Sequence, residues 1–326
     1  MKVFITGGSG FVGKRLVKKL LMEGHDVCAF ARSRSSAEIL SKLGCKTIIG
    51  DLLNPISYAD SLKGQDVVIH AASPVSFWGE WSFFQQNIID ISKNLFNAAA
   101  EHKVPRFIYI SSESVIQNDT PLENIDETFP YIEPNSFYGK AKQLTERWLL
   151  KQNGHMACII LRPAFIWGPN VSALNAMVEK VKKGQFIWLD NGEVIIESVH
   201  VDNVVHAIHL ALTKGENKQV YYVTDDNPRS VKSIISDLLT TQNITPPTKN
   251  CPSKPIKYLA SFVEFFWKQL HIKSTPPISR FEWSFVAVPR IYNIQKIKTA
   301  LAYKPMMSTK AGLAEMAHNK QGEKHE

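Results

Sequence analysis

A glycine-rich turn near the start of the chain constrains the fold more than any other feature of the sequence. The apolar residues 3–5 lead into Gly7, Gly10 and Gly13, and apolar residues at helical spacing follow. This order predicts a buried strand, a tight turn and a helix whose positive dipole end faces the turn. Although the glycine spacing alone is a weak signal, its position between a strand and a helix predicts a dinucleotide-binding turn, because the bare backbone N–H groups can approach a pyrophosphate.

A tyrosine and a lysine one helical turn apart form the second informative feature. Residues 143–150 are helical in pattern, so Tyr138 and Lys142 share one helix face. The pKa of a free phenol is about 10, and a neighbouring ammonium favours the phenolate. The pair therefore predicts a tyrosine that exchanges a proton with a substrate. An ordinary surface helix is the alternative, which the glycine turn and the serines described next make weaker.

Two serines end the apolar segment 106–110. Ser111 and Ser112 are expected at the carboxyl edge of a parallel sheet, where the ligands of such sheets bind. One serine is expected to cap the turn after the strand and the other to face a substrate. We assign the substrate contact to Ser112, and Ser111 replaces it if the strand register differs by one residue.

Together these features resemble the extended short-chain dehydrogenase/reductase superfamily, the group of proteins similar to NAD-dependent epimerases and dehydratases. Trp78-Gly79-Glu80-Trp81 and residues 161–169 are most similar to its 3β-hydroxysteroid dehydrogenase and β-keto-acid reductase branch. Residues 87–91 depart from the family pattern by a slip of one residue. The other segments that carry the resemblance are residues 50–52, 69–72 and 199–204.

The resemblance implies an α/β fold: a Rossmann-type, doubly wound parallel sheet with a smaller, irregular C-terminal substrate-binding lobe. Residues 1–165 would form the NAD(P)-binding domain, with a returning segment near 195–225, and residues 166–326 would form the lobe. Apolar strands alternate with helical patterns to about residue 165, as in βαβ units. Prolines then break the second half into short pieces, which agrees with this division.

The resemblance also implies which residues act in catalysis and cofactor binding. Tyr138 would exchange the proton, Lys142 would lower the tyrosine pKa and hold the nicotinamide ribose, and Ser112 would hydrogen-bond the substrate oxygen. No metal is expected, because no third ligand accompanies His206 and His209 in the sequence. The predicted cofactor-binding residues are Gly7, Gly10, Phe11, Val12, Gly13, Arg32, Asp51, Leu52, Ala71, Ala72, Tyr138, Lys142 and Pro163.

The end of the second apolar strand predicts that NADP(H) is preferred over NAD(H). NAD enzymes of this fold place an acid there to bind the ribose 2′-hydroxyl. Here residues 30–34 contain two arginines, and the next carboxylate is that of Glu38. Arg32 would make a charge-assisted contact with a 2′-phosphate. The alternative is that both arginines are solvated loop residues that do not contact the cofactor, in which case the cofactor can be NAD.

An aromatic-rich helical segment, residues 258–267, predicts an apolar substrate. Its apolar side chains cover more than a normal amphipathic stripe, and Trp78 and Trp81 are expected on the same side of the sheet edge. The segment is shorter than the roughly 20 residues that span a bilayer. Core packing, a homodimer face and peripheral membrane contact, aided by nearby lysines, remain alternatives. Those lysines are Lys254, Lys257 and Lys268.

These inferences predict an NAD(P)-dependent oxidoreductase that interconverts a hydroxyl and a ketone on a sterol-like or long-chain keto substrate by hydride transfer. A sugar-nucleotide epimerase or dehydratase is one alternative, and it would need a polar, cationic lobe. A non-catalytic dinucleotide sensor is another, and it would be expected to lack Tyr138 and Lys142. The aromatic segment alone suggests a third alternative, a membrane scaffold.

Composition agrees with an enzyme that acts on a small molecule. The chain has 326 residues, is 44% apolar and carries a formal charge of +8, but its lysines are scattered, so nucleic acid is not an expected partner. Four separated cysteines and the lack of a signal-peptide pattern predict a reducing, cytoplasmic location. His200 is expected to hydrogen-bond locally, and Asp202 to cap a helix that begins near Asn203.

Overall fold

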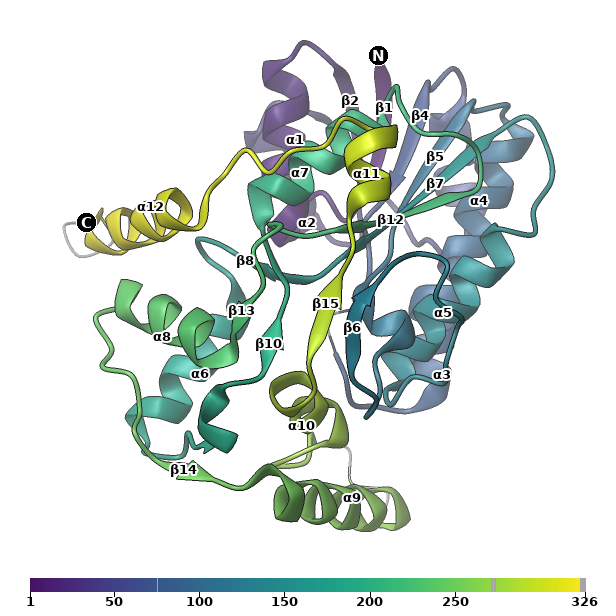
Figure 1. The fold of residues 1–326 in the computed structure, drawn as a ribbon. Coiled ribbons are helices and arrows are strands. Elements are labelled where there is room, and N and C mark those ends of the chain that lie inside the picture. Colours follow the sequence, from purple (N-terminus) through teal and green to yellow (C-terminus); the bar gives the residue numbers. More distant parts are fainter. Residues whose placement is uncertain (75, 271, 273, 323–326) are drawn as a thin grey trace.

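The computed structural model describes residues 1–74, 76–270, 272 and 274–322. Its centre is a seven-stranded parallel sheet in the order β12-β7-β5-β4-β1-β2-β3 (Figure 1). This order, which runs outward in both directions from β1, confirms the predicted doubly wound α/β class. The strands are β1 (Lys2–Thr6), β2 (Asp26–Ala31), β3 (Lys46–Ile49), β4 (Val67–His70), β5 (Arg106–Ile110), β7 (Ala157–Pro163) and β12 (Gln219–Val223).

Alternating side chains of the strands build a hydrophobic core on each face of the sheet. Val3 and Ile5 of β1 belong to one core, and Phe4 belongs to the other. Both faces are covered by helices, as parallel sheets require. The first face carries α1 (Phe11–Met22), α2 (Arg34–Lys42), α7 (Val201–Ala211) and α11 (Gln295–Ala300), and the second carries α4 (Ile91–Glu101) and α5 (Phe137–Leu149).

A smaller mixed sheet, in the order β13-β10-β15-β6, forms the centre of the second lobe. Its strands are β6 (Leu122–Ile125), β10 (Ile195–Ile196), β13 (Arg229–Ser230) and β15 (Arg290–Tyr292). Two short parallel pairs accompany it: β8 (Phe165–Trp167) with β11 (Ser198–His200), and β9 (Trp188–Leu189) with β14 (Asn250–Cys251). The remaining longer helices are α6 (Ser172–Lys182), α8 (Val231–Thr241), α9 (Ser253–Gln269), α10 (Arg280–Ala287) and α12 (Thr309–Gly322).

One strand of the lobe comes from the first half of the chain. After β5 the chain enters the lobe, pairs β6 with β15 in parallel, and returns to form α5. Before this excursion, the buried Glu113 accepts a hydrogen bond from the Tyr292 hydroxyl at 2.6 Å and pairs with Arg290 at 3.4 Å. Residues 122–125, which the sequence placed in the 1–165 domain, therefore complete the sheet of the lobe.

The segment that departs from the family pattern contains an irregular helix. The short helix α3 (Trp81–Phe84) continues through a π-helical stretch, Gln85–Asp90, into α4. A π-helical turn closes its hydrogen bonds over one more residue than an α-helical turn. The one-residue slip at residues 87–91 thus coincides with a local change of helix type.

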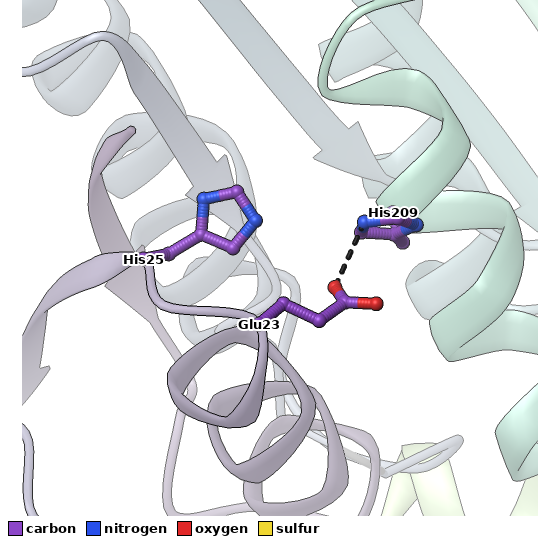
Figure 2. Close-up of side chains that lie close together, drawn as sticks. All are labelled: Glu23, His25 and His209. Atoms are coloured by element: carbon purple, nitrogen blue, oxygen red, sulfur yellow. Dashed lines mark ion pairs between the residues drawn. The ribbon is translucent and has the colours of Figure 1, made fainter.

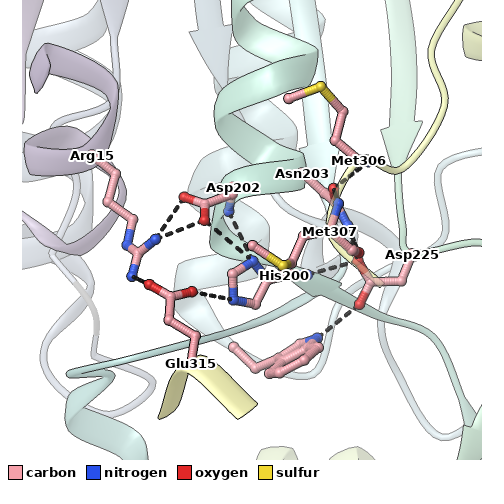
Figure 3. A network of polar contacts seen from close by, with 9 residues as sticks. Arg15, His200, Asp202, Asn203, Asp225, Met306, Met307 and Glu315 are labelled. Atoms are coloured by element: carbon pink, nitrogen blue, oxygen red, sulfur yellow. Dashed lines mark hydrogen bonds and ion pairs between the residues drawn. The ribbon is translucent and has the colours of Figure 1, made fainter. Parts of the chain in front are cut away.

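A network of ion pairs fixes the start of α7 to α1 and α12 (Figure 3). Arg15 of α1 pairs with Asp202 at 2.7 Å and with Glu315 of α12 at 2.8 Å. Helix α7 begins at Val201, and the ring of its N-cap His200 accepts the Asp202 N–H. The predicted local hydrogen bond of His200 is confirmed. The predicted cap by Asp202 is wrong: the helix begins earlier, so this carboxylate lies in its first turn, where the helix dipole favours it.

Helix α9 does not join the hydrophobic core. Of its 17 residues, only Ser253 and Ala260 are buried, so core packing does not explain its aromatic side chains. It lies at the edge of the lobe farthest from the N-terminus (Figure 1). Within the described part of the chain, no helix is both long enough and apolar enough to cross a membrane.

Candidate active site

Close backbone approaches fix two glycines of the turn between β1 and α1. Gly7 has a φ of +77°, and a Cβ there would lie 2.6 Å from the backbone carbon of Ala71. A Cβ on Gly13 would overlap the carbonyl oxygen of Gly7. Only glycine lets strand, turn and helix pack this closely. The packing directs the start of α1 toward the carboxyl edge of the sheet.

The N-terminus of α1 has the chemistry of an anion site. Its N-cap Gly10 has extended backbone and makes no side-chain hydrogen bond, and the first turn carries no acidic residue. The N–H groups of Phe11, Val12 and Gly13 therefore have no capping side chain as acceptor, and the helix dipole adds partial positive charge. These residues fit the pyrophosphate of a dinucleotide.

Five further predicted cofactor residues lie at the carboxyl ends of three strands of the sheet. Ala71 and Ala72 follow β4, Asp51 and Leu52 follow β3, and Pro163 ends β7. The Asp51 side chain is exposed, whereas Leu52 and Pro163 are buried. Because the strands are parallel, these positions lie at the same edge of the sheet as the glycine turn.

Arg32 lies at this edge as well, directly after β2. It is exposed, and the following Ser33 caps α2 by accepting the Ser36 N–H at 3.2 Å. Among the residues that the structure describes, no carboxylate pairs with Arg32 or with Arg34. The end of β2 is therefore cationic, which suits a phosphate better than a bare ribose hydroxyl.

A glycine brings Tyr138 to the serines that follow β5. Helix α5 is capped by Ser136, whose hydroxyl accepts the Gly139 N–H at 3.1 Å. A Cβ on Gly139 would overlap the carbonyl oxygen of Ser114. The first turn of α5 can therefore press against the turn after β5 only because residue 139 has no side chain. This role of the glycine between the tyrosine and the lysine was not predicted from the sequence.

Lys142 is buried beside Tyr138. Its Nζ lies 6.0 Å from the centroid of the Tyr138 ring and donates a hydrogen bond to the Ile110 carbonyl at 2.8 Å. Burial lowers the pKa of Lys142 to about 7, while the carboxylate of Glu146 one turn further raises it. The Lys142 side chain is thus held at the end of β5, and its pKa lies near neutral pH.

Tyr138 holds its proton firmly in this structure. Burial raises its pKa to about 12, and hydrogen bonding with Ser112 and Ser73 lowers it by less. The predicted lowering by Lys142 is not observed, because the loss of hydration outweighs the effect of neighbouring groups. At neutral pH the phenol is protonated, which is the form that donates to a carbonyl oxygen.

Ser112 combines two roles that were expected of different serines. Its hydroxyl accepts the Ser114 N–H at 3.1 Å and so caps the turn after β5, and it also lies near enough to Tyr138 to lower the pKa of the phenol. The hydroxyl of Ser111 is buried without a hydrogen-bond partner among the described residues. Ser73 supplies a further hydroxyl at Tyr138. Ser73 was not predicted from the sequence, where its one signal is its position directly after Ala71-Ala72.

Aromatic rings from both lobes meet at Tyr138. The ring of Phe77 lies edge-on to Tyr138, with centroids 5.3 Å apart, and stacks on Phe281 of α10 at 3.9 Å. The ring of Trp81 lies edge-on to that of Phe137, with their centroids 5.6 Å apart. The site therefore borders an apolar surface built from the loop after β4, the start of α5 and the second lobe.

A buried ion pair supports the helix that carries Tyr138 and Lys142. The guanidinium of Arg162, on β7, binds the Glu146 carboxylate, with its shortest contact at 2.6 Å, and both side chains are almost fully buried. Tyr131 donates a further hydrogen bond to Glu146 at 2.8 Å. Arg162 thus supplies the counter-charge for a carboxylate that is buried one helical turn from Lys142.

A cluster of possible metal ligands lies apart from this edge. His209 does have companions, contrary to the expectation from sequence: Glu23 and His25 place ligand atoms within 4.8 Å of it (Figure 2). They could not be found by spacing, since they lie in a distant segment. Glu23 pairs with His209 at 2.8 Å and with Lys19 at 2.7 Å. Both oxygens of this carboxylate thus have cationic or imidazole partners.

Comparison with known proteins extends these observations. The model of a family described as the NAD dependent epimerase/dehydratase family matches residues 3–224. A 4-hydroxy-2-methyl-3-oxo-4-farnesyl-3,4-dihydroquinoline-1-oxide ketoreductase of Stigmatella aurantiaca is 29% identical, with 96% of this chain and 95% of that protein covered. A decarboxylating sterol-4-alpha-carboxylate 3-dehydrogenase of Dictyostelium discoideum is 27% identical, with 96% and 99% covered.

Solved structures share the fold. A UDP-glucose 4-epimerase of Thermotoga maritima superposes with a TM-score of 0.77 at 22% identity, and the match covers 100% of both chains. At this identity, the likeness concerns the arrangement of strands and helices.

Proposed function

Because this chain belongs to the NAD-dependent epimerase/dehydratase family, as its motifs predicted, we propose that it is an NAD(P)-dependent oxidoreductase that interconverts a hydroxyl and a ketone on an apolar substrate. The observation that carries the proposal is the convergence of Tyr138, Ser112 and Lys142 at the carboxyl edge of the sheet. The bound nicotinamide would supply or accept the hydride. The four cysteines, all free, agree with a cytoplasmic location.

Each of the three residues has a role that follows from its surroundings. In the reductive direction, the protonated Tyr138 donates its hydroxyl proton to the substrate oxygen. Ser112, whose hydroxyl lies near Tyr138, can donate to the same oxygen and stabilise its developing negative charge. Lys142, with a pKa of about 7, supplies positive charge beside the phenol as the tyrosine gives up its proton.

The surroundings of Tyr138 favour an apolar substrate, sterol-like or a long keto compound. Phe77 and Phe281 are its neighbours, and the names of the two relatives include a farnesyl compound and a sterol. A sugar nucleotide would instead need polar and cationic side chains in the second lobe to bind its diphosphate.

A substrate screen tests this proposal. We expect NAD(P)H to be consumed with a steroid ketone or a long-chain 3-oxo acid and not with UDP-glucose, as followed by the absorbance of the reduced nicotinamide. Conversion of UDP-glucose to its epimer, with no turnover of any apolar ketone or alcohol, would identify a sugar-nucleotide enzyme instead.

We further propose that Arg32 makes NADPH the preferred cofactor. A charge-assisted contact contributes about 1.5–3 kcal/mol, so Arg32→Glu should weaken NADPH binding by about 10- to 100-fold and leave NADH binding within a few-fold. Lys42→Glu makes the same charge change at the far end of α2 and serves as the control. Fluorescence titration with both cofactors measures the effect. Tighter binding of NADH than of NADPH by the unaltered protein would refute the preference.

A further inference from the structure

The exposed aromatic side chains of this protein gather in one place. Six phenylalanines are exposed among the described residues, and all belong to α9, the start of α5 or the loop and helix that follow β4. Scattered single apolar residues are normal on a protein surface, whereas a contiguous patch marks an interaction site. The aromatic patch comprises Phe77, Phe83, Phe137, Tyr258, Leu259, Phe262, Phe265, Phe266 and Leu270.

Helix α9 supplies most of this patch. Its apolar members from Tyr258 to Leu270 are between 41% and 75% exposed. At about 100° per residue they cover an arc of about 140°, opposite the side on which Ala260 is buried. The helix therefore packs on the lobe with its small residues and presents its large ones outward, the reverse of an ordinary surface helix.

Contacts connect α9 to the rest of the patch and to the active site. The Nζ of Lys268 lies 5.9 Å from the ring of Trp78 and 5.8 Å from that of Phe137. Phe137 directly precedes Tyr138, and the ring of Phe77 contacts Tyr138 edge-on. One apolar surface thus extends from α9 to the catalytic tyrosine.

The charges around α9 are mainly cationic. Lys254, Lys257 and Lys268 lie on one flank of the helix, and Glu264 is its only acidic residue. The Glu264 carboxylate accepts the N–H of Arg280 at 2.7 Å. Lys257 is paired with Asp119 on the lobe; Glu80 is the exposed acid beside the loop part of the patch.

We propose that the aromatic patch inserts into the interface of a lipid bilayer that contains anionic lipids. Interfacial helices combine an exposed apolar face of aromatic and leucine side chains with flanking lysines, as α9 does. A second copy fits less well, because a two-fold symmetric contact through α9 would bring the lysine flanks of the two helices together, and the one acid of each helix, Glu264, already accepts the Arg280 N–H. If the proposed function holds, the patch also leads an apolar substrate from the bilayer to Tyr138.

Vesicle flotation of the full-length protein, without cofactor or substrate, tests membrane binding independently of catalysis. We expect binding to phosphatidylcholine vesicles that contain phosphatidylglycerol, and weaker binding to phosphatidylcholine alone. Phe262→Asp combined with Phe265→Asp should reduce binding by about tenfold or more, because it removes two rings whose transfer from water into the bilayer interface is favourable. Ile56→Asp, an exposed apolar residue on the other lobe, is the control and should bind like the unaltered protein.

Three results would overturn the proposal. The unaltered protein fails to float with either kind of vesicle, or the double variant floats as well as the unaltered protein. The third is a dimer, detected by light scattering, that the double variant abolishes while no vesicle binds, which would identify a second copy as the occupant. Circular dichroism shows whether the variants remain folded, which is expected because both phenylalanines are exposed.

Discussion

Replacing Tyr138 by phenylalanine is expected to lower turnover by about 10²–10⁴-fold, the usual contribution of a general acid or base. The substitution removes one hydroxyl and retains the ring that packs against Phe77. Cofactor affinity should stay within a few-fold, because the glycine turn is untouched. Steady-state kinetics and fluorescence titration of the cofactor measure the two quantities separately.

Two further variants distinguish a proton-transfer role from a packing role. Tyr221→Phe removes a hydroxyl on β12, outside the proposed site, and should retain activity. Lys142→Met should lower both turnover and cofactor affinity, since Lys142 is assigned to the phenol and to the cofactor. Activity of Tyr138→Phe near that of the unaltered protein would remove Tyr138 from the mechanism.

The Arg162→Met substitution is expected to destabilise the protein by about 3–5 kcal/mol, because it leaves the buried Glu146 carboxylate without its counter-charge. Urea denaturation followed by circular dichroism measures the free energy of unfolding. Lys140→Met is the matched control on α5: its ion pair with Glu133 is exposed, and such pairs contribute about 0–1 kcal/mol.

A double variant separates lost charge pairing from lost packing. Arg162→Met with Glu146→Leu removes both buried charges, so it should recover most of the lost stability. If Arg162→Met alone costs no more than Lys140→Met, the ion pair does not stabilise α5, and the support proposed for Lys142 fails with it.

The parts of the site that could be predicted from sequence are those encoded locally. Gly7 and Gly13 signal a tight turn, and the spacing of Tyr138 and Lys142 places them on one helix face. The carboxyl-edge positions follow from the order of the parallel strands. Each of these inferences needs only neighbouring residues and the general rules of an α/β fold.

The parts that could not be predicted depend on residues far apart in the chain. Phe77 and Phe281 stack only because the second lobe folds back on the loop after β4. The pKa of Tyr138 depends on burial, which a sequence pattern does not measure, so desolvation reversed the expected direction. Likewise, the partners of His209 are Glu23 and His25, which lie between α1 and β2, and no sequence feature near residue 209 indicates them.

The excursion of β6 makes the two lobes inseparable. The chain passes from Ser112 into the sheet of the lobe and returns to Tyr138, so these two residues flank a strand that belongs to the other half of the molecule. A fragment ending at residue 165 would keep β6 without its partner β15. Grafting a new lobe from a relative must therefore also replace the segment between Ser112 and Tyr138, and substrate preference and catalytic geometry would be inherited together.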